Sequence, residues 1–102
     1  MHFSIVILTY NEAANLEACL DSVSWADDVV VVNSFSTDGT VSIAEARGAR
    51  VIQRKFDDFG SQRNYAHEAG DLKHRWVFHL DADERFNEAL RKKCERVVEL
   101  DE

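Results

Sequence analysis

The stretch Phe3-Ser4-Ile5-Val6-Ile7-Leu8-Thr9-Tyr10 is an almost continuous apolar run, and it decides the fold class. A run of this kind predicts a strand that is buried on both faces, which is typical of parallel sheets. Shorter β-rich runs follow it, and they alternate with segments of helical periodicity. The further strands are expected at residues 28–33, 50–53 and 76–80, and the helices at residues 12–23, 41–47, 61–69 and after Asn87.

Regular alternation of buried strands and helices predicts an α/β fold: a Rossmann-like parallel sheet with right-handed crossovers and helices on both faces. No linker or repeat interrupts the pattern, so residues 1–102 are expected to form a single domain. Asn11, Ser61 and Asn87 are predicted to cap the first, third and fourth helices. Gly48 is predicted to end the second helix.

Polar residues collect where three of the predicted strands end. They are Thr9–Glu12 after the first strand, Asn33–Asp38 after the second and Asp81–Asp83 after the fourth. In open parallel sheets, ligands bind beyond the carboxyl ends of the strands. The three strand ends therefore predict a ligand site at one edge of the sheet.

The pair Asp81 and Asp83 indicates the chemistry of this site. Two close carboxylates either share a proton or hold a cation. Asp-x-Asp after a strand suits a hard divalent ion such as Mg²⁺ or Mn²⁺, which keeps several waters and binds phosphate oxygens. The alternative is an acidic turn that faces solvent. No GxGxxG turn follows the first strand, which disfavours a dinucleotide fold, and a P-loop is absent too. Acidic residues together with a metal suggest a diphosphate whose charge the metal neutralises. Tyr10 would then lie against a base, and Asn33 and Asp38 would hydrogen-bond a base or ribose.

Composition narrows the partners and the compartment. A net charge of −7 argues against nucleic acid, which needs a basic face. No apolar run reaches the length of a membrane span. Cys19 and Cys94 lack metal or redox spacing and are expected to be reduced thiols, which fits the cytoplasm. The basic run Arg91–Lys93 is expected to be a solvated face, with a weak contact to an anionic membrane as the alternative.

Three motifs, Ile5–Glu12, Val32–Thr40 and Leu80–Glu84, resemble in order and spacing the inverting family-2 glycosyltransferases of the GT-A fold. The strongest likeness is to the bacterial lipopolysaccharide-core β-glucosyltransferases. The resemblance implies a nucleotide-diphosphate sugar as donor, a UDP-sugar first among them, with a divalent metal. It also implies transfer to a glycan or lipid-linked acceptor in cell-envelope synthesis, at the inner face of the cytoplasmic membrane.

The resemblance also assigns roles to residues. Thr9, Tyr10 and Glu12 would lie against the nucleotide, and Arg63 on the third helix would approach it. Asp81 would lie near the ribose or metal, and Asp83 would be the main metal ligand. The expected nucleotide-sugar-binding set is Thr9, Tyr10, Asn11, Glu12, Asn33, Ser34, Ser36, Asp38, Arg63, Asp81, Ala82 and Asp83.

The sequence departs from the family at two points. Asn33 stands where the family usually has an aspartate that accepts a hydrogen bond from the base, so Asn33→Asp is expected to tighten uridine nucleotides. The sequence also ends at Glu102, near the end of the family's nucleotide-binding half, and no catalytic base is assigned. Glu84 and Glu88 are the nearest spare carboxylates. We therefore expect donor binding without sugar transfer by this chain alone. The alternative is a non-catalytic nucleotide-binding or assembly module.

The family's strand order places residues 76–80 at an edge of the sheet. An apolar edge strand exposes backbone groups that can pair with another chain. Two copies of the chain are therefore expected to meet near this edge as a homo-oligomer.

Overall fold

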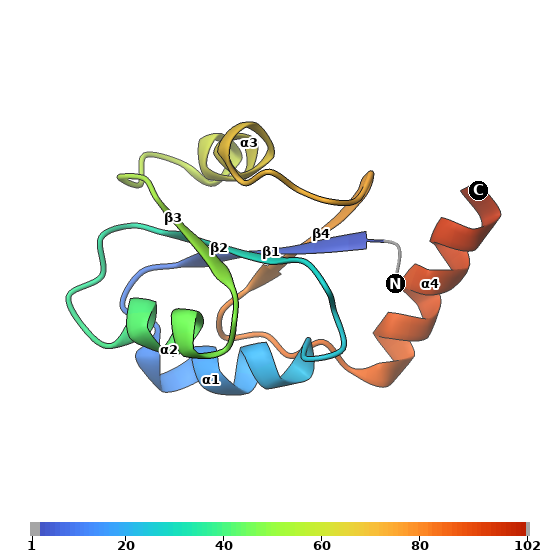
Figure 1. Cartoon of the computed structure of the whole chain (residues 1–102), viewed down its shortest axis with the longest axis horizontal. Helices are drawn as coiled ribbons and strands as arrows, with labels where there is room; N and C mark the ends of the chain where they lie inside the picture. Colours follow the sequence, from blue (N-terminus) through green and yellow to red (C-terminus); the bar gives the residue numbers. More distant parts are fainter. Residues whose placement is uncertain (1–2, 102) are drawn as a thin grey trace.

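One four-stranded parallel sheet organises the protein, as the sequence predicts (Figure 1). The structure is a computed structural model, and it describes residues 3–101. The strand order is β3-β2-β1-β4. In chain order the elements are β1 (Phe3–Thr9), α1 (Ala13–Ser22), β2 (Val29–Asn33), α2 (Thr40–Ala46), β3 (Arg50–Gln53), α3 (Phe59–Ala69), β4 (Trp76–Asp81) and α4 (Glu88–Asp101).

Both faces of the central strands are covered, which explains their continuous apolar sequence. Side chains alternate across a strand, so Ile5 and Ile7 of β1 belong to one core cluster and Val6 to another. The first cluster contains residues of α1, α2 and α4, and the second contains Ala66 of α3. Figure 1 shows α1 and α2 on one side of the sheet and α3 on the other. The predicted two-sided helical cover is confirmed.

Two of the predicted helix caps are wrong. Helix α1 begins after Glu12, because Asn11 adopts a positive φ of 50° and lies outside the helix. Helix α3 begins two residues before Ser61, because the Asp58 side chain accepts a hydrogen bond from the Ser61 N–H. Asn87 does cap α4, since its Oδ1 accepts from the Leu90 N–H at 2.8 Å. Gly48 follows α2 with a φ of 80°, as predicted for the residue after the helix.

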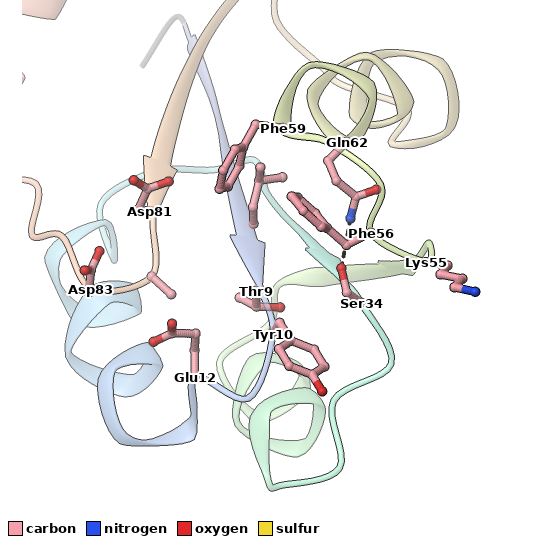
Figure 2. Close-up of a pocket in the computed structure, with 12 residues that line it drawn as sticks. Thr9, Tyr10, Glu12, Ser34, Lys55, Phe56, Phe59, Gln62, Asp81 and Asp83 are labelled. Carbon is pink, nitrogen blue, oxygen red and sulfur yellow. Dashed lines mark hydrogen bonds between the residues drawn. The ribbon is translucent and has the colours of Figure 1, made fainter.

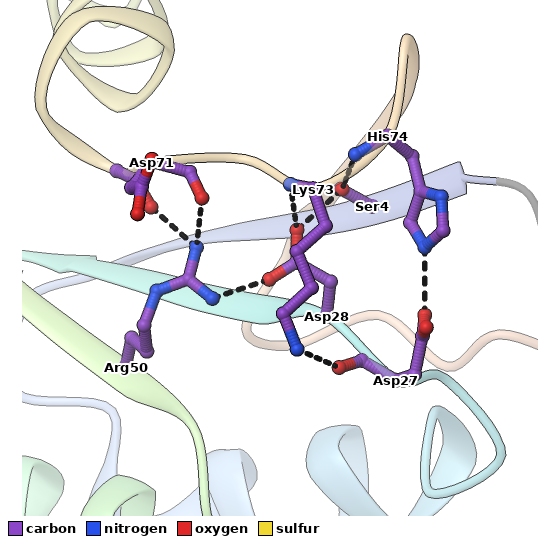
Figure 3. A network of polar contacts seen from close by, with 8 residues as sticks. Ser4, Asp27, Asp28, Arg50, Asp71, Lys73 and His74 are labelled. Atoms are coloured by element: carbon purple, nitrogen blue, oxygen red, sulfur yellow. Dashed lines mark hydrogen bonds and ion pairs between the residues drawn. The ribbon is translucent and has the colours of Figure 1, made fainter.

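A buried acid ties the amino ends of the strands together (Figure 3). Asp28 is 1% exposed and precedes β2. Its carboxylate accepts hydrogen bonds from Ser4 of β1, from Arg50 of β3 at 2.6 Å and from the Lys73 N–H at 2.8 Å. Arg50 also donates to the backbone carbonyls of Gly70 and Asp71. This network anchors the α3–β4 connection and leaves the carboxyl ends of the strands for the pocket.

Strand β4 forms one edge of the sheet, as the sequence predicts. Beside it, Trp76, Phe78, Cys94 and Val98 line an apolar groove of about 280 Å³ between β4 and α4. The expected meeting of two chains at this edge stays a prediction. Among residues 3–101, no helix combines the length and the apolar character that a membrane span requires.

Candidate functional site

A pocket lies where the carboxyl ends of β1, β2 and β4 meet. Register pairs Thr9 with Asn33 and Leu8 with Asp81, which brings the three strand ends to one edge. The pocket has a volume of about 640 Å³ (Figure 2). It is lined by Leu8, Thr9, Tyr10, Glu12, Ser34, Lys55, Phe56, Phe59, Gln62, Asp81, Ala82 and Asp83.

One side of the pocket is acidic. Figure 2 shows the carboxylates of Glu12, Asp81 and Asp83 gathered on the same side. The Asp81 N–H donates to Oε1 of Glu84 at 2.8 Å, and the Glu84 N–H donates to the Asp81 carbonyl at 2.9 Å. These two bonds fix the turn that carries both aspartates. Both aspartates are exposed, so solvent and ligand can reach their oxygens.

Beneath this turn lies a protonated thiol. The Cys19 Sγ–H donates to the Asp81 carbonyl at 3.7 Å. Burial raises the pKa of Cys19 to about 11, against an opposing effect of the Arg85 charge, and the nearby acidic residues add to the effect of burial. Cys19 is therefore an inert packing group, and both cysteines are free thiols, as the sequence predicts.

The acidic side offers a small set of oxygen donors for a metal. Across residues 3–101, no cluster of three or more His, Cys, Asp or Glu side chains is arranged to hold an ion. Asp81 and Asp83 are two exposed oxygen donors. This set fits a hard ion such as Mg²⁺ or Mn²⁺, which takes one or two carboxylates and completes its shell with waters and phosphate oxygens. A soft or fully protein-bound metal would need more ligands.

The opposite side of the pocket is aromatic. Tyr10 is 61% exposed, and Phe56 and Phe59 are 45% and 58% exposed. The two phenylalanine rings meet edge to face with centroids 5.1 Å apart. Exposing several large aromatic rings together to water is unfavourable, so such a cluster often marks a binding site. The faces of these rings can stack on a flat ring of a ligand. Lys55 lies at the margin, with its amino group directed away from the other lining residues (Figure 2).

A buried glutamine attaches the aromatic wall to the sheet. Gln62 of α3 is 1% exposed, and its Nε2 donates to the Ser34 Oγ at 3.0 Å. Its Oε1 accepts from Arg54 at 2.9 Å, and Arg54 in turn pairs with Asp57 at 2.8 Å. The hydrogen bond from Arg54 holds the pKa of Asp57 below its ordinary value. The β3–α3 connection is thereby held over the end of β2.

Asp38 supports the site from outside the pocket. Its Oδ2 accepts from the Ala13 N–H at 3.2 Å, and its Oδ1 accepts from the Thr40 N–H at 3.0 Å. The Thr40 hydroxyl also donates to it, and this bond is the main reason that the pKa of Asp38 lies below its ordinary value. Asp38 therefore joins the amino ends of α1 and α2.

The structure brings together most, but not all, of the predicted site residues. Seven of them line the pocket: Thr9, Tyr10, Glu12, Ser34, Asp81, Ala82 and Asp83. Asn33 is the buried last residue of β2, and Asn11, Ser36 and Asp38 lie in the loops that follow β1 and β2. Arg63 lies on the outer face of α3, with its guanidinium 5.9 Å from the centre of the Phe59 ring.

Sequence reasoning missed five lining residues, which are Leu8, Lys55, Phe56, Phe59 and Gln62. The residues that it missed come mainly from segment 54–62, which the sequence describes as a charged loop followed by a helix. The available signal was the pair Phe56 and Phe59. Two large aromatic residues in an otherwise charged segment need a partner, and here they face the pocket.

Comparison with known proteins identifies the family. The sequence model of the family described as "Glycosyl transferase family 2" matches residues 4–100. The chain belongs to this family. It is 39% identical over 95 residues to an uncharacterized glycosyltransferase of Rickettsia bellii, covering 92% of this chain and 32% of that protein. It is 32% identical over 94 residues to the lipopolysaccharide core biosynthesis glycosyltransferase LpsC of Rhizobium meliloti, covering 87% and 34%.

Solved structures of other proteins share the fold. The crystal structure of S. aureus TarS 1–349 in complex with UDP-GlcNAc aligns with a TM-score of 0.76 and 25% identity, covering 97% of this chain and 31% of that one. The Mycobacterium tuberculosis glucosyl-3-phosphoglycerate synthase, in complex with Mn²⁺, UDP-glucose and phosphoglyceric acid, aligns with a TM-score of 0.65 and 27% identity, covering 79% and 33%. The chain spans about a third of the length of the curated relatives it matches. The GT-A fold and a glycosyltransferase family-2 domain are thus confirmed.

Proposed function

We propose that the pocket binds a nucleotide-diphosphate sugar, a UDP-sugar foremost, together with Mg²⁺ or Mn²⁺, as the donor for glycosyl transfer. The observation that carries this proposal is the division of one pocket into an acidic side and an aromatic side. A nucleoside diphosphate has the same division, with a flat base at one end and charged oxygens at the other.

Each side of the pocket has a role in this proposal. Asp83 and Asp81 would hold the metal ion, which would neutralise charge on the diphosphate as it leaves the sugar. The base would lie against Tyr10 and the Phe56–Phe59 pair, where ring-to-ring contact adds to apolar burial. In this arrangement the diphosphate and the base would contact opposite sides of the same pocket.

The relatives support the donor and the kind of acceptor. TarS is seen with UDP-GlcNAc, and the mycobacterial synthase with Mn²⁺ and UDP-glucose. The name of LpsC supports a glycan or lipid-linked acceptor of the cell envelope, and hence work at the inner face of the cytoplasmic membrane. Glu84 is hydrogen-bonded to the Asp81 N–H, and Glu88 lies 3.6 Å from Lys92, so both nearest spare carboxylates already have partners.

The test is calorimetric titration with UDP in Mn²⁺ and in EDTA. We expect binding in Mn²⁺ that EDTA weakens strongly, because the diphosphate needs the ion to approach the carboxylates. Asp83→Asn should remove the gain from Mn²⁺ while the fold persists, because an exposed loop residue contributes little to stability.

A matched control removes the same charge elsewhere. Glu68 is exposed on α3 and lines no part of the pocket. Glu68→Gln should keep the full response to Mn²⁺. Equal affinity of the wild type in Mn²⁺ and EDTA, or equal loss in both variants, would contradict the proposed metal site.

A further inference from the structure

The orientation of one buried amide at the back of the pocket follows from its neighbours. The Phe35 backbone N–H can only donate, and it donates to Oε1 of Gln53 at 3.2 Å. The same oxygen lies 2.9 Å from the Asn33 side chain, which must therefore present its Nδ2 donor there. The Asn33 Oδ1 then faces the other way, toward β1 and the loop after β2.

This oxygen collects two hydroxyl groups. Thr9 donates to the Asn33 Oδ1 at 2.8 Å, and Ser36 donates to it at 2.6 Å. The Ser36 oxygen in turn accepts the Asn11 N–H at 2.9 Å. Asn11 has a positive φ of 50°, an uncommon conformation for a residue other than glycine. A relay thus runs from Gln53 through Asn33 and Ser36 to the turn that carries Tyr10.

Burial removes Asn33 from direct contact with a ligand. Its exposed fraction is 0%, and each of its side-chain polar atoms is used inside the protein. Thr9, by contrast, lines the pocket while its hydroxyl proton points to Asn33. Position 33 therefore supplies one acceptor to the hydroxyl pair and one donor to Gln53, a combination that an amide has and a carboxylate lacks.

We propose that Asn33 is a positioning residue that must be an amide, and that it sets the Thr9–Asn11 corner of the pocket instead of contacting the base. The consequence for binding rests on the proposed nucleotide-binding function. The role differs from the contact with the base that family resemblance implies for this position, and it reverses the expected effect of Asn33→Asp. A carboxylate at this position would place one of its oxygens against the Gln53 Oε1 with no hydrogen between them. The two oxygens would repel each other, and the hydrogen bonds from Asn33 through Ser36 to Asn11 would be displaced.

A protonated carboxylic acid restores the pattern, because it has one O–H donor and one carbonyl acceptor. The test is UDP titration in Mn²⁺ for Asn33→Asp and wild type, with affinities expressed as a ratio at each pH. We expect the variant to bind about tenfold more weakly at about pH 8, and within about twofold of the wild type at about pH 5. Changes in the protonation of UDP and of the acidic side of the pocket affect both proteins alike, so they cancel in this ratio. Binding to each protein is measured at a temperature where circular dichroism shows it folded.

Gln53→Glu is the matched amide-to-acid exchange. Only Oε1 of Gln53 takes part in the relay, and a carboxylate oxygen can accept both N–H groups without a proton. Gln53→Glu should therefore show no recovery at low pH. Tighter binding by Asn33→Asp, or a ratio that does not change with pH, would overturn the inference.

A ligand-free measurement separates this inference from the proposed function. The backbone amide resonance of Asn11 in a ¹⁵N–¹H spectrum reports on the hydrogen bond from the Asn11 N–H to the Ser36 oxygen, the last bond of the relay. We expect it to be displaced in Asn33→Asp at about pH 8 and to return toward the wild-type position at about pH 5. A resonance unchanged at both values would overturn the relay. Failure of wild-type UDP binding with a displaced Asn11 resonance would overturn the proposed function and leave the relay supported.

Discussion

Asp28 shows how a single residue can carry a charge in the interior of this small protein. Burial alone would raise the pKa of its carboxyl, but hydrogen bonds from Lys73, Ser4 and Arg50 together lower it below its ordinary value. Buried charges persist when their lone pairs are satisfied in this way. The acid is therefore a fixed point for the amino ends of β1, β2 and β3.

Asp28→Ala should lower the free energy of unfolding by about 2 to 3 kcal/mol, because it leaves the buried Ser4 hydroxyl, the Lys73 N–H and the Arg50 guanidinium without this acceptor. The stabilisation by Asp28 is present above the ordinary pKa of 3.8 and is lost as the pH falls through the lower value in the folded protein. Urea unfolding at neutral pH and in acid measures both effects, and the gap between variant and wild type should shrink in acid.

Asp27 provides the control at the adjacent position. It is exposed and pairs with His74 at 2.8 Å on the surface. Exposed ion pairs contribute little, so Asp27→Ala should unfold close to the wild type. An equal loss in both variants would show that local charge, and not the buried network, sets stability at this end of the sheet.

At the scale of the elements, the end of α3 depends on a glycine for a packing reason. Gly70 ends the helix with an ordinary φ of −80°, so conformational freedom is not what the position needs. A Cβ placed there would lie 2.4 Å from the Ala66 carbonyl oxygen. Gly70→Ala should therefore cost about 2 kcal/mol, because backbone must shift to make room, and thermal unfolding measures the loss.

Gly39→Ala is the paired control for this prediction. Gly39 has a φ of −79°, and a Cβ there would meet nothing within 4 Å. The substitution should be neutral or should stabilise the protein by up to about 1 kcal/mol, because alanine lowers the conformational entropy of the unfolded chain. A loss at Gly39 as large as that at Gly70 would mean that crowding against Ala66 is not the cause.

The strands were predictable because their sequence pattern is local. Apolar runs such as Phe3–Tyr10 report burial on both faces, and alternation with helices then determines a parallel sheet. The caps of α1 and α3 were less predictable, because they depend on distant or competing partners. The Asn11 side chain accepts the Thr37 N–H at 2.8 Å, a contact across 26 residues that no local pattern contains. Asp58 and Ser61 are both good caps, and sequence alone does not rank them.

The site was predictable for a related reason. In a parallel sheet, the carboxyl ends of the strands share an edge, so the positions of Thr9 and Asp81 at strand ends are enough to place them together. The aromatic wall was not predictable in the same way. Phe56 and Phe59 reach the pocket because Arg54 and Gln62 hold their segment over β2, and such tertiary hydrogen bonds leave no periodic signal.

At the scale of the whole molecule, charge opposes the ligand that we propose. The net charge is −7, and three carboxylates line the pocket. A nucleoside diphosphate is also an anion, so the protein's field repels it over roughly 10 Å at moderate salt. The base and ribose carry no such penalty. The diphosphate can therefore contribute to binding only when a divalent ion offsets the negative potential of the carboxylates in the pocket.

This balance predicts a change in ligand order with metal. In EDTA, uridine should bind at least as well as UDP, because both offer the base to the aromatic wall and only UDP meets the negative field. In Mn²⁺, UDP should bind more tightly than uridine, by about tenfold or more, because the ion links the diphosphate to Asp81 and Asp83. Competition titrations at fixed ionic strength compare the two ligands directly. Added sodium chloride should narrow the difference in EDTA, since salt screens repulsion between exposed charges. UDP that binds more tightly than uridine in EDTA would contradict the argument, and would mean that a cationic group of the chain, such as Lys55, receives the diphosphate without a metal.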